Sequence, residues 1–448
     1  MKISRRTFVK SLSLAALAAG AGVRAQGPGG TLFQNVSIFD GTSSTLSPPS
    51  NVLVKGNVIA ILGRDRISAE GATVIDGTGR TLMPGLIDAH AHATAATVSI
   101  LQILNSDPNY MMLRHGKAAG ELLMQGFTAV RDVGGNSFGL KRAIDEGQIV
   151  GPRIWSSGAG ISQTSGHGDW RSKIELPRGP TGPLSFAERT MGSMIADGIP
   201  EVQRRVREQL MLGAALIKLM AGGGVASDSD PLDVTQYSEG EIRAAVEDVE
   251  NWGTYVAVHA YTPRAIQRAI NAGVKCIEHG QLADDASAKL MAERNVWWSL
   301  QPFLDDEDAI PYTEGSANRQ KQIQLLKGTD NAYALAKKHK IKTAFGTDTL
   351  FDAKLAARQG AQLAKLVRWY SPAETLKMAT GDNGELLALS GLRNPYPGKI
   401  GVVQQGALAD LLLVEGNPIT NIKLIEDPAK NFVVIMKDGK IYKNTLAK

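Results

Sequence analysis

Six side chains able to take part in a metal site lie in the middle of the chain, each near the end of a short apolar segment. Two of them, His90 and His92, are two residues apart, so their side chains point the same way if the segment is a β-strand. Imidazole and carboxylate groups suit zinc and similar divalent ions. The pattern therefore predicts a metal centre built from these residues: His90, His92, Lys218, His259, His279 and Asp348.

Lys218 raises a chemical difficulty, because a protonated amine is a cation and repels a metal ion. A lysine that points into the same pocket as several histidines is compatible with bound metal only when its amine is modified or deprotonated. If Lys218 belongs to the site, its chemical state must therefore differ from that of an ordinary surface lysine.

Eight short apolar segments carry these residues, and amphipathic helical patterns such as 239–253 separate most of them. Continuous apolar strands are typical of parallel sheets covered on both faces. Eight such units in about 300 residues predict an α/β fold, a (β/α)8 TIM-like barrel over residues 83–390, with the active face at the carboxyl ends of the strands. The predicted strands lie in 85–92, 127–134, 153–161, 215–223, 255–262, 275–281, 296–303 and 342–349.

The two ends of the chain have a different pattern. Residues 31–82 and 391–448 alternate apolar and polar side chains and are interrupted by Gly, Asn and Asp, as in short strands joined by tight turns. We expect these two ends to pair into one small β-sandwich domain. Within the barrel, residues 164–200 are rich in Gly, Pro and Arg and are predicted to form a longer loop and candidate lid.

Residues 1–25 resemble a twin-arginine export signal. The sequence SRRTFVK is followed by an apolar stretch rich in Ala and Gly, which is too short to span a membrane. Small residues then precede a cleavage position that we place after Ala25. The resemblance implies export in the folded state to the periplasm or the medium, with no membrane association once the signal is removed.

Charge and cysteine content exclude several kinds of protein. The five Lys and Arg residues of the first 25 positions equal the formal net charge of +5, so the rest of the chain is neutral. No basic stripe remains that would indicate a nucleic-acid partner. The single cysteine, Cys276, rules out an intramolecular disulfide and a cysteine-based zinc site.

Five short motifs at the predicted strand ends form a recognisable set. They are GLIDAHAH at 85–92, IK at 217–218, VH at 258–259, IEHG at 277–280 and FGTD at 345–348. Together they closely resemble the amidohydrolase superfamily, and the resemblance extends over the predicted barrel and both β-rich ends.

This resemblance implies a specific use of each ligand. In that family the lysine of the fourth strand is carboxylated by CO₂, and the resulting carbamate bridges two metal ions. A modified Lys218 would thus be an anionic ligand, and two divalent ions, with zinc the expected metal, would be the cofactors. The resemblance assigns His90, His92 and Asp348 to the first ion, His259 and His279 to the second, and Lys218 to both.

The resemblance also implies a mechanism. A hydroxide shared by two metal ions is a nucleophile at neutral pH, because metals lower the pKa of bound water. Asp348 would take the proton of this nucleophile and pass it to the leaving nitrogen. Asp348 is therefore the predicted catalytic residue as well as a metal ligand.

Four further residues receive predictions from their place in the sequence. His167 follows the third strand and resembles a histidine that contacts the substrate carbonyl or carboxylate. Tyr237 follows the fourth strand and is predicted to donate its hydroxyl to a substrate oxygen. His115, in a helical pattern, and His339, in a run of lysines, are predicted to be solvated.

Within the superfamily, the motifs look most like a branch that acts on dipeptides and N-acyl amino acids, including Xaa-Pro dipeptidases and carboxypeptidases and ochratoxin-cleaving enzymes. The implied reaction is hydrolysis of an amide beside a free carboxylate in a small molecule or short peptide. A lactonase, phosphotriesterase or deaminase on the same barrel is the alternative, and an inactive periplasmic binding protein is an alternative of another class. The family habit implies a homo-oligomer.

Overall fold

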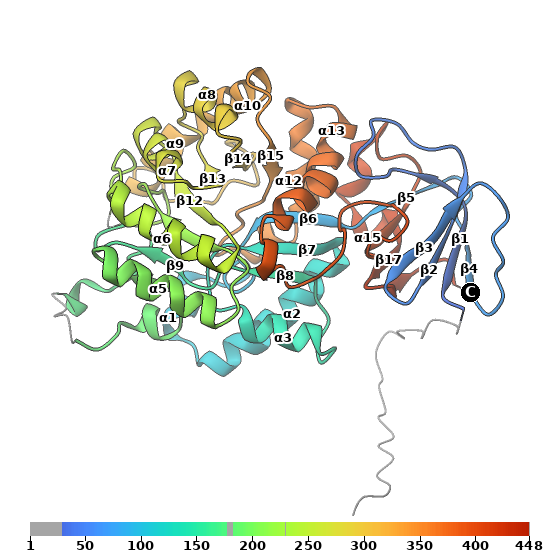
Figure 1. Cartoon of the computed structure of the whole chain (residues 1–448), viewed down its shortest axis with the longest axis horizontal. Helices are drawn as coiled ribbons and strands as arrows, with labels where there is room; N and C mark the ends of the chain where they lie inside the picture. The colour runs from blue at the N-terminus through green and yellow to red at the C-terminus, as the bar shows by residue number, and fades with distance from the viewer. Residues whose placement is uncertain (1–28, 177–181, 229, 448) are drawn as a thin grey trace, which may run out of the picture.

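The computed structural model describes residues 29–176, 182–228 and 230–447. Figure 1 shows two parts side by side: a larger one in which helices surround parallel strands, and a smaller one that combines the blue start of the chain with its red end. The predicted export signal at 1–25 lies outside the described residues. Within them, no helix has the length and apolar character needed to cross a membrane.

The larger part is built on two sheets of parallel strands. One has the order β6-β7-β8 and the other the order β10-β9-β11-β12-β13-β14-β15. The backbone amide of Asp348, just beyond β15, donates to the carbonyl of His90 in β6 over 2.9 Å, so the last strand lies against the first. The strands are β6 (Leu86–Ala91), β7 (Phe127–Asp132), β8 (Arg153–Ser156), β9 (Gly160–Ser162), β10 (Ser193–Ile195), β11 (Ile217–Met220), β12 (Val256–Ala260), β13 (Cys276–His279), β14 (Trp297–Leu300) and β15 (Thr343–Phe345).

Each of the eight predicted strand segments contains a strand, but the third is broken. Residues 153–161 divide into β8, which pairs with β7, and β9, which pairs with β11. Gly158, between the two pieces, has a φ of +72°, which extended backbone does not adopt. The break lets one sequence segment contribute β8 to the edge of the three-stranded sheet and β9 to the larger sheet, where it lies between β10 and β11.

Helices follow most strands and bury one face against them. α6 (Glu239–Trp252) shows why the sequence folds this way: Ser238 and Glu241 form a capping box at its start, and Gly253 ends it with a φ of +71°. The other helices of the larger part are α1 (Ile100–Asn105), α2 (Pro108–Met124), α3 (Phe138–Asp145), α4 (Phe186–Arg189), α5 (Ile199–Met211), α7 (Pro263–Asn271), α8 (Asp285–Glu293), α9 (Ala317–Leu326), α10 (Thr329–Lys338), α11 (Ala353–Ala356), α12 (Gln359–Ala364), α13 (Pro372–Lys377) and α14 (Asn383–Ala388), with short helical turns η1 (Lys173–Glu175), η2 (Lys365–Arg368), η3 (Met378–Asp382) and η4 (Gly391–Arg393).

The segment 164–200 has more regular structure than the predicted loop. It contains η1, α4 and β10, and β10 pairs in parallel with β9. The loop prediction is therefore wrong for its last part, because residues 193–195 extend the edge of the larger sheet. Its residues 177–181 lie outside the described residues.

The smaller part contains strands from both ends of the described chain. The antiparallel pair β5–β16 connects them, and β1 links the two halves of the mixed sheet β18-β17-β16-β5-β1-β2-β3, with β4 beside β1. Inward side chains from both ends form one apolar cluster that includes Phe33, Val54 and Leu413. The elements are β1 (Thr31–Ile38), β2 (Ser50–Lys55), β3 (Val58–Gly63), β4 (Thr73–Asp76), β5 (Arg80–Pro84), β16 (Leu411–Glu415), η5 (Ile422–Ile425), α15 (Pro428–Asn431), β17 (Phe432–Lys437) and β18 (Lys440–Asn444).

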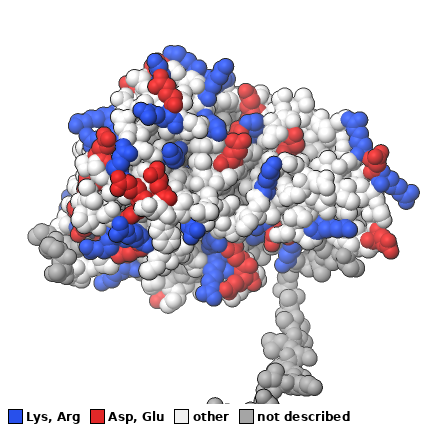
Figure 2. Space-filling model, in the orientation of Figure 1, with Lys and Arg blue, Asp and Glu red and all other residues white. Residues whose placement is uncertain are grey.

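The two parts are also linked by buried charge. Arg153, at the start of β8, bonds through Nε to Asp410 Oδ2 and through Nη2 to Asp438 Oδ1, each over 2.7 Å. On the face drawn in Figure 2, basic and acidic side chains are interspersed over both parts.

Candidate active site

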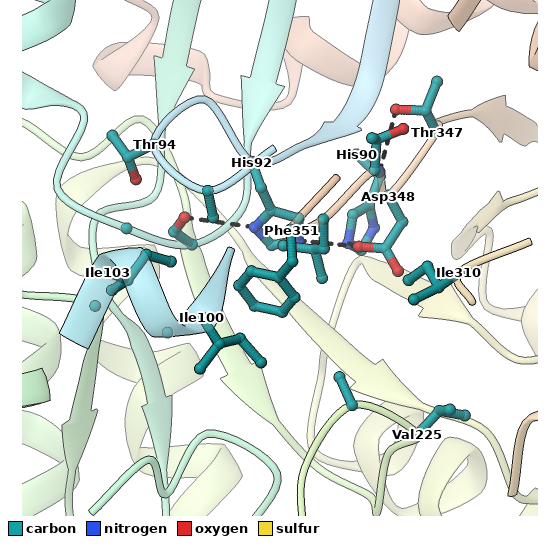
Figure 3. Close-up of a pocket in the computed structure, with 18 of the residues that line it drawn as sticks. His90, His92, Thr94, Ile100, Ile103, Val225, Ile310, Thr347, Asp348 and Phe351 are labelled. Carbon is teal, nitrogen blue, oxygen red and sulfur yellow. Dashed lines mark hydrogen bonds and ion pairs between the residues drawn. The ribbon is translucent and has the colours of Figure 1, made fainter. Parts of the chain in front are cut away.

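All six predicted ligand residues meet at the carboxyl ends of the parallel strands, where they line one cavity of about 570 Å³. The ring centroids of His90 and His279 are 4.7 Å apart, and those of His259 and His279 are 4.5 Å apart. Figure 3 shows the rings of His90 and His92 and the carboxylate of Asp348 converging on one wall of this cavity.

Asp348 lies at the centre of the first group of predicted ligands. Its Oδ1 is 3.3 Å from His90 Nε2 and 3.0 Å from His92 Nε2. Its Oδ2 is 3.9 Å from His279 Nδ1. His90, His279 and Asp348 offer ligand atoms that all lie within 4.8 Å of one another, a grouping that can hold a metal ion. The residues predicted to bind the first ion therefore lie next to those predicted to bind the second.

The ring of His90 is oriented by a buried carboxylate. His90 Nδ1 lies 2.7 Å from Glu278 Oε2, and the other oxygen of Glu278 accepts from Arg131 Nη2 over 2.6 Å. This leaves His90 Nε2 as the ring atom that faces Asp348. A carboxylate behind a ligand histidine is a common way to fix its ring and raise its basicity.

The two histidines of the second group are held through different ring atoms. His279 Nδ1 is 2.8 Å from Gln301 Oε1, so Nε2 remains for a ligand. His259 Nε2 is 3.0 Å from the carbonyl of Gly223, so Nδ1 remains. Burial, with repulsion from neighbouring cationic groups, holds the pKa of both rings well below the usual range. Both are thus neutral, as metal ligands must be.

Lys218 is 2% exposed on the cavity wall. Within the described part of the chain, its amine has neither a hydrogen bond nor an ion pair. Burial lowers the pKa of this amine, although the carboxylates of Glu278 and Asp348 act in the opposite direction. A lower pKa increases the fraction of neutral amine, which is the nucleophilic form.

The charge of Asp348 is also set by its surroundings. Burial favours its neutral form, but attraction from His90 and hydrogen bonds from His90 and His92 hold the pKa of the carboxyl well below its usual value. Burial lowers the pKa of His92, but the hydrogen bond to Asp348 and the attraction of Asp348 and Asp132 together raise it above its usual value. Asp348 is therefore a carboxylate, ready to accept a proton or bind a cation.

His167 lines the same cavity, in keeping with its predicted substrate-facing position. Its ring stacks on that of His259 with centroids 4.1 Å apart, and its Nδ1 lies 2.7 Å from Ser227 Oγ. Burial lowers the pKa of His167 to about 4, although Asp230 attracts the charged form. Its Nε2 has no bonded partner among the described residues.

The structure corrects the prediction for Tyr237. Its hydroxyl donates to the backbone carbonyl of Ala196 over 2.9 Å, and the side chain is 3% exposed within the core. Tyr237 does not line the cavity, because the turn before α6 directs its ring towards β10 instead. Another tyrosine, Tyr261 at the end of β12, does line the cavity and packs against His259 and His279.

The outer wall of the cavity is mostly apolar and comes from several helices and loops. In Figure 3, Ile100 and Ile103 lie on one side and Val225 and Ile310 on the other, with Phe351 in front of His92. Further apolar residues of this wall are Met111, Met112, Trp170, Phe186, Phe303, Leu325 and Leu355.

His115 also belongs to this wall, and the prediction that it is solvated is wrong. Its side chain in α2 is 7% exposed, and neither ring nitrogen has a hydrogen-bond partner among the described residues. Burial lowers its pKa to about 4. The residues buried with it, Met111 and Ala119, lie four positions to either side on the same helix face. Helical periodicity in the sequence could therefore have predicted that His115 is buried.

Three supporting residues were not predicted from the sequence: Arg131, Glu278 and Gln301. A signal existed for the first two, since each is a charged residue next to apolar residues of a short predicted strand, and such charges are buried only when paired. Gln301 follows β14 and has no such signal.

Comparison with known proteins agrees with this geometry. Residues 81–444 match the Amidohydrolase family, so the fold is TIM-like with parallel sheets and the chain belongs to that family of hydrolases acting on amide bonds. The ochratoxinase of Aspergillus niger is 33% identical over 374 residues, which is 81% of this chain and 75% of that protein.

Two solved structures show the same similarity in three dimensions. A prolidase complexed with N-methylphosphonate-L-proline is 33% identical, with a TM-score of 0.85, and covers 93% of this chain and 100% of its own. A Xaa-Pro dipeptidase with bound methionine in the active site is 27% identical, with a TM-score of 0.80, and covers 92% of this chain and 100% of its own.

Amidohydrolases are generally metal-dependent, and the residues of this cavity fit metal ions. The donor set consists of the imidazoles of His90, His92, His259 and His279 and the ionised carboxylate of Asp348. Such nitrogen and oxygen ligands suit zinc and other divalent ions.

Proposed function

We propose that this chain is a binuclear metal-dependent amidohydrolase that cleaves an amide bond beside a carboxylate-bearing amino acid. Its substrate would be a dipeptide, the C-terminal residue of a peptide, or an N-acyl amino acid such as ochratoxin A. The observation that carries the proposal is Lys218, a buried amine with no partner among the described residues, on the wall of the cavity that also holds the four histidines and the aspartate predicted as ligands. A carbamate at this amine would complete both metal sites.

The expected cofactors are two divalent ions, with zinc the expected metal, and the carbamate on Lys218. When bound, the ions would supply an activated water and polarise the scissile carbonyl. His90, His92 and Asp348 would hold the first ion, and His259 and His279 the second.

Side chains of the protein would carry out the proton transfer, bind the substrate and exclude water. Asp348 Oδ1, between His90 and His92, would hold the proton released by the nucleophile and deliver it to the leaving nitrogen. His167 would contact the substrate beside the scissile bond. The apolar outer wall would exclude water and accept the rest of the substrate.

The substrate class is supported by what the related proteins have in common. The names of the similar proteins refer to ochratoxin, to Xaa-Pro dipeptides and to a proline phosphonate. Each of these compounds places an amide, or its phosphonate replacement, beside a free carboxylate. The mostly apolar wall of the cavity would suit an apolar side chain or acyl group on either side of that bond.

The experiment that tests this function is a substrate panel with added zinc. Dipeptides, N-acyl amino acids and ochratoxin A are tested beside lactones, phosphotriesters and N-heterocyclic amines, and bound metal is measured in the same preparation. Turnover of carboxylate-bearing amides with two ions per chain is expected. Turnover of only the other classes would favour a lactonase, phosphotriesterase or deaminase, and a metal-free, inactive protein would favour a binding protein.

We further infer that the two parallel sheets close into one (β/α)8 barrel and that the terminal sheet forms a β-sandwich. The bond from the Asp348 amide to the His90 carbonyl supports the closure. The single apolar cluster shared by strands from both ends of the chain supports the sandwich.

Location and assembly are also proposals. The twin-arginine pattern in residues 1–25 supports export of the folded protein to the periplasm or the medium, and sequencing the N-terminus of the exported protein tests it. A start at Met1 would contradict cleavage after Ala25. We propose a homo-oligomer with a small-molecule or short peptide substrate and no nucleic-acid partner, which light scattering of the purified protein can examine.

A further inference from the structure

A buried chain of hydrogen bonds runs from His167 away from the metal cavity. His167 Nδ1 is 2.7 Å from Ser227 Oγ, and Ser227 Oγ in turn donates to Asp230 Oδ1. Ser227 and Asp230 are each 2% exposed. Neither residue lines the cavity, so they reach it only through His167.

The direction of these bonds follows from the donors available at Asp230. Its Oδ2 accepts from the backbone amide of Gly224 over 2.8 Å and from Gln236 Nε2 over 3.1 Å. Its Oδ1 accepts the one proton that the Ser227 hydroxyl possesses. Ser227 therefore has no proton left for His167, and the bond between them requires a proton on His167 Nδ1.

Other contacts show that this arrangement is built into the loop. The backbone amide of His167 donates to Gln236 Oε1 over 3.0 Å. A Cβ at Gly224 would lie 2.0 Å from the His167 ring, so only glycine fits there. The amine of Lys321 donates to the carbonyls of Gly224, Ser227 and Asp230 over 2.7 to 2.9 Å and holds the loop from the outside.

We propose that Ser227 and Asp230 are positioning residues for the hydrolytic reaction: they keep the proton of His167 on Nδ1 and thereby present Nε2 to the substrate. The inference rests on the proposed function, in which His167 contacts the substrate. It adds that this contact uses one defined ring nitrogen, Nε2, which in this tautomer is a hydrogen-bond acceptor and therefore meets an N–H donor of the substrate rather than a carbonyl or carboxylate oxygen. This nitrogen is selected by a serine and an aspartate that never touch the substrate. The logic is that of a carboxylate holding a histidine in one tautomer.

The first test compares Ser227→Ala with Ser227→Thr. Alanine removes the acceptor for Nδ1–H, so kcat/KM on a carboxylate-bearing amide should fall by roughly 10- to 100-fold, as when the outer partner of a functional histidine is removed. Threonine keeps the hydroxyl and should recover most of that loss. Bound metal should not change in either variant, because neither contacts a predicted ligand. Ser390→Ala, which removes another buried hydroxyl that does not line the cavity, is the matched control and should leave activity unchanged.

The second test is Asp230→Asn, which should reverse the direction of the hydrogen bonds between residue 230, Ser227 and His167. The Gly224 and Gln236 donors at Oδ2 require the amide oxygen of Asn on that side, so its NH₂ group must face Ser227. The Ser227 hydroxyl would then donate to His167 Nδ1 and move the ring proton to Nε2. This variant should lose at least as much activity as Ser227→Ala.

The direct readout is the ¹⁵N spectrum of protein labelled at histidine, with the His167 signals assigned by the variant His167→Asn. Protonated Nδ1 in the unmodified chain, and protonated Nε2 in Asp230→Asn, are expected. Protonated Nε2 with a bare Nδ1 in the unmodified chain, or equal loss in Ser227→Ala and Ser227→Thr, would overturn the proposal. The spectrum needs no substrate, so it can fail or succeed independently of the proposed amide hydrolysis.

Discussion

Two buried arginines form ion pairs in different parts of this molecule. Comparing them separates the contacts that shape the candidate site from the contacts that join the two parts. Arg131 lies in β7, 0% exposed, and pairs with Glu278, whose other oxygen orients His90. Arg153 lies between the two parts of the molecule and pairs with Asp410 and with the half-exposed Asp438.

The two ion pairs have similar distances, but their partners differ in what else they do. The carboxylate of Glu278 is shared with a predicted metal ligand, whereas those of Asp410 and Asp438 contact the backbone and neighbouring side chains of the terminal sheet. A buried ion pair is weak evidence for stability in itself. The comparison therefore predicts that changes near Arg131 alter catalysis, and that changes near Arg153 alter only the stability of the fold.

Lys218→Ala should have the largest effect on the candidate site, the region that contains Arg131. It removes the amine that would carry the bridging carbamate, so both predicted ions should be lost. Removing one group that stabilises charge at a reacting centre lowers kcat by roughly 10²- to 10³-fold, and the loss here should be at least that large. Metal content and kcat are measured together. Full activity with two ions still bound would contradict the bridging role.

Glu278→Gln should affect both properties. It leaves the Arg131 guanidinium buried without a counter-charge, which typically costs about 3–5 kcal/mol of folding free energy. It also weakens the support of His90, and loss of such an outer partner usually lowers metal affinity or activity by roughly 10- to 100-fold. Urea unfolding and metal titration measure the two effects. Lower stability with unchanged metal affinity and activity would mean that the ion pair of Arg131, like that of Arg153, contributes only to stability.

Asp410→Asn should lower stability without lowering kcat. Arg153 keeps its bond to Asp438, so the loss should be about 1.5–3 kcal/mol, the usual contribution of a hydrogen bond to a charged group. Asp438→Asn is the matched control: this carboxylate is half exposed, so its loss should be smaller. A reduced kcat at saturating substrate in Asp410→Asn would show that the outer ion pair also shapes the site.

His115 gives the smallest predicted effect, seen as pH dependence. Its folded pKa of about 4 lies below the unfolded value, so the unfolded chain binds the extra proton as pH falls. Stability is thus retained above about pH 6.5 and lost towards pH 4; between pH 6.5 and 5 the loss should be about 1.5 kcal/mol, since one pKa unit corresponds to about 1.4 kcal/mol. His115→Leu should remove this part of the slope in unfolding curves. An unchanged slope would mean that His115 is not buried as a neutral ring.

The sequence predicted the strands well, because a short, continuous apolar run that ends in His, Lys or Asp is typical of a parallel sheet with a site at its edge. The sequence also predicted that the six candidate ligand residues lie together, since the carboxyl ends of such strands must meet, and they line one cavity. Tyr237 was misplaced because a sequence position after a strand does not say which way the chain turns, and its ring faces Ala196. Ser227 and Asp230 lie in a loop without periodicity, so only three-dimensional contacts could connect them to His167.

The pairing of the two chain ends has a consequence for the order of folding. Asn57 bonds to Asp438 across 381 residues, and the antiparallel partner of β5 is the distant strand β16. Contacts of such long separation form late, because a long loop must be closed before they gain any free energy. The parallel strands, which mostly pair with near neighbours in sequence, can assemble during synthesis of the chain. Until β16 is synthesised, β5 keeps an open edge that can pair with another chain, so newly made molecules should be most prone to aggregate before β16 emerges.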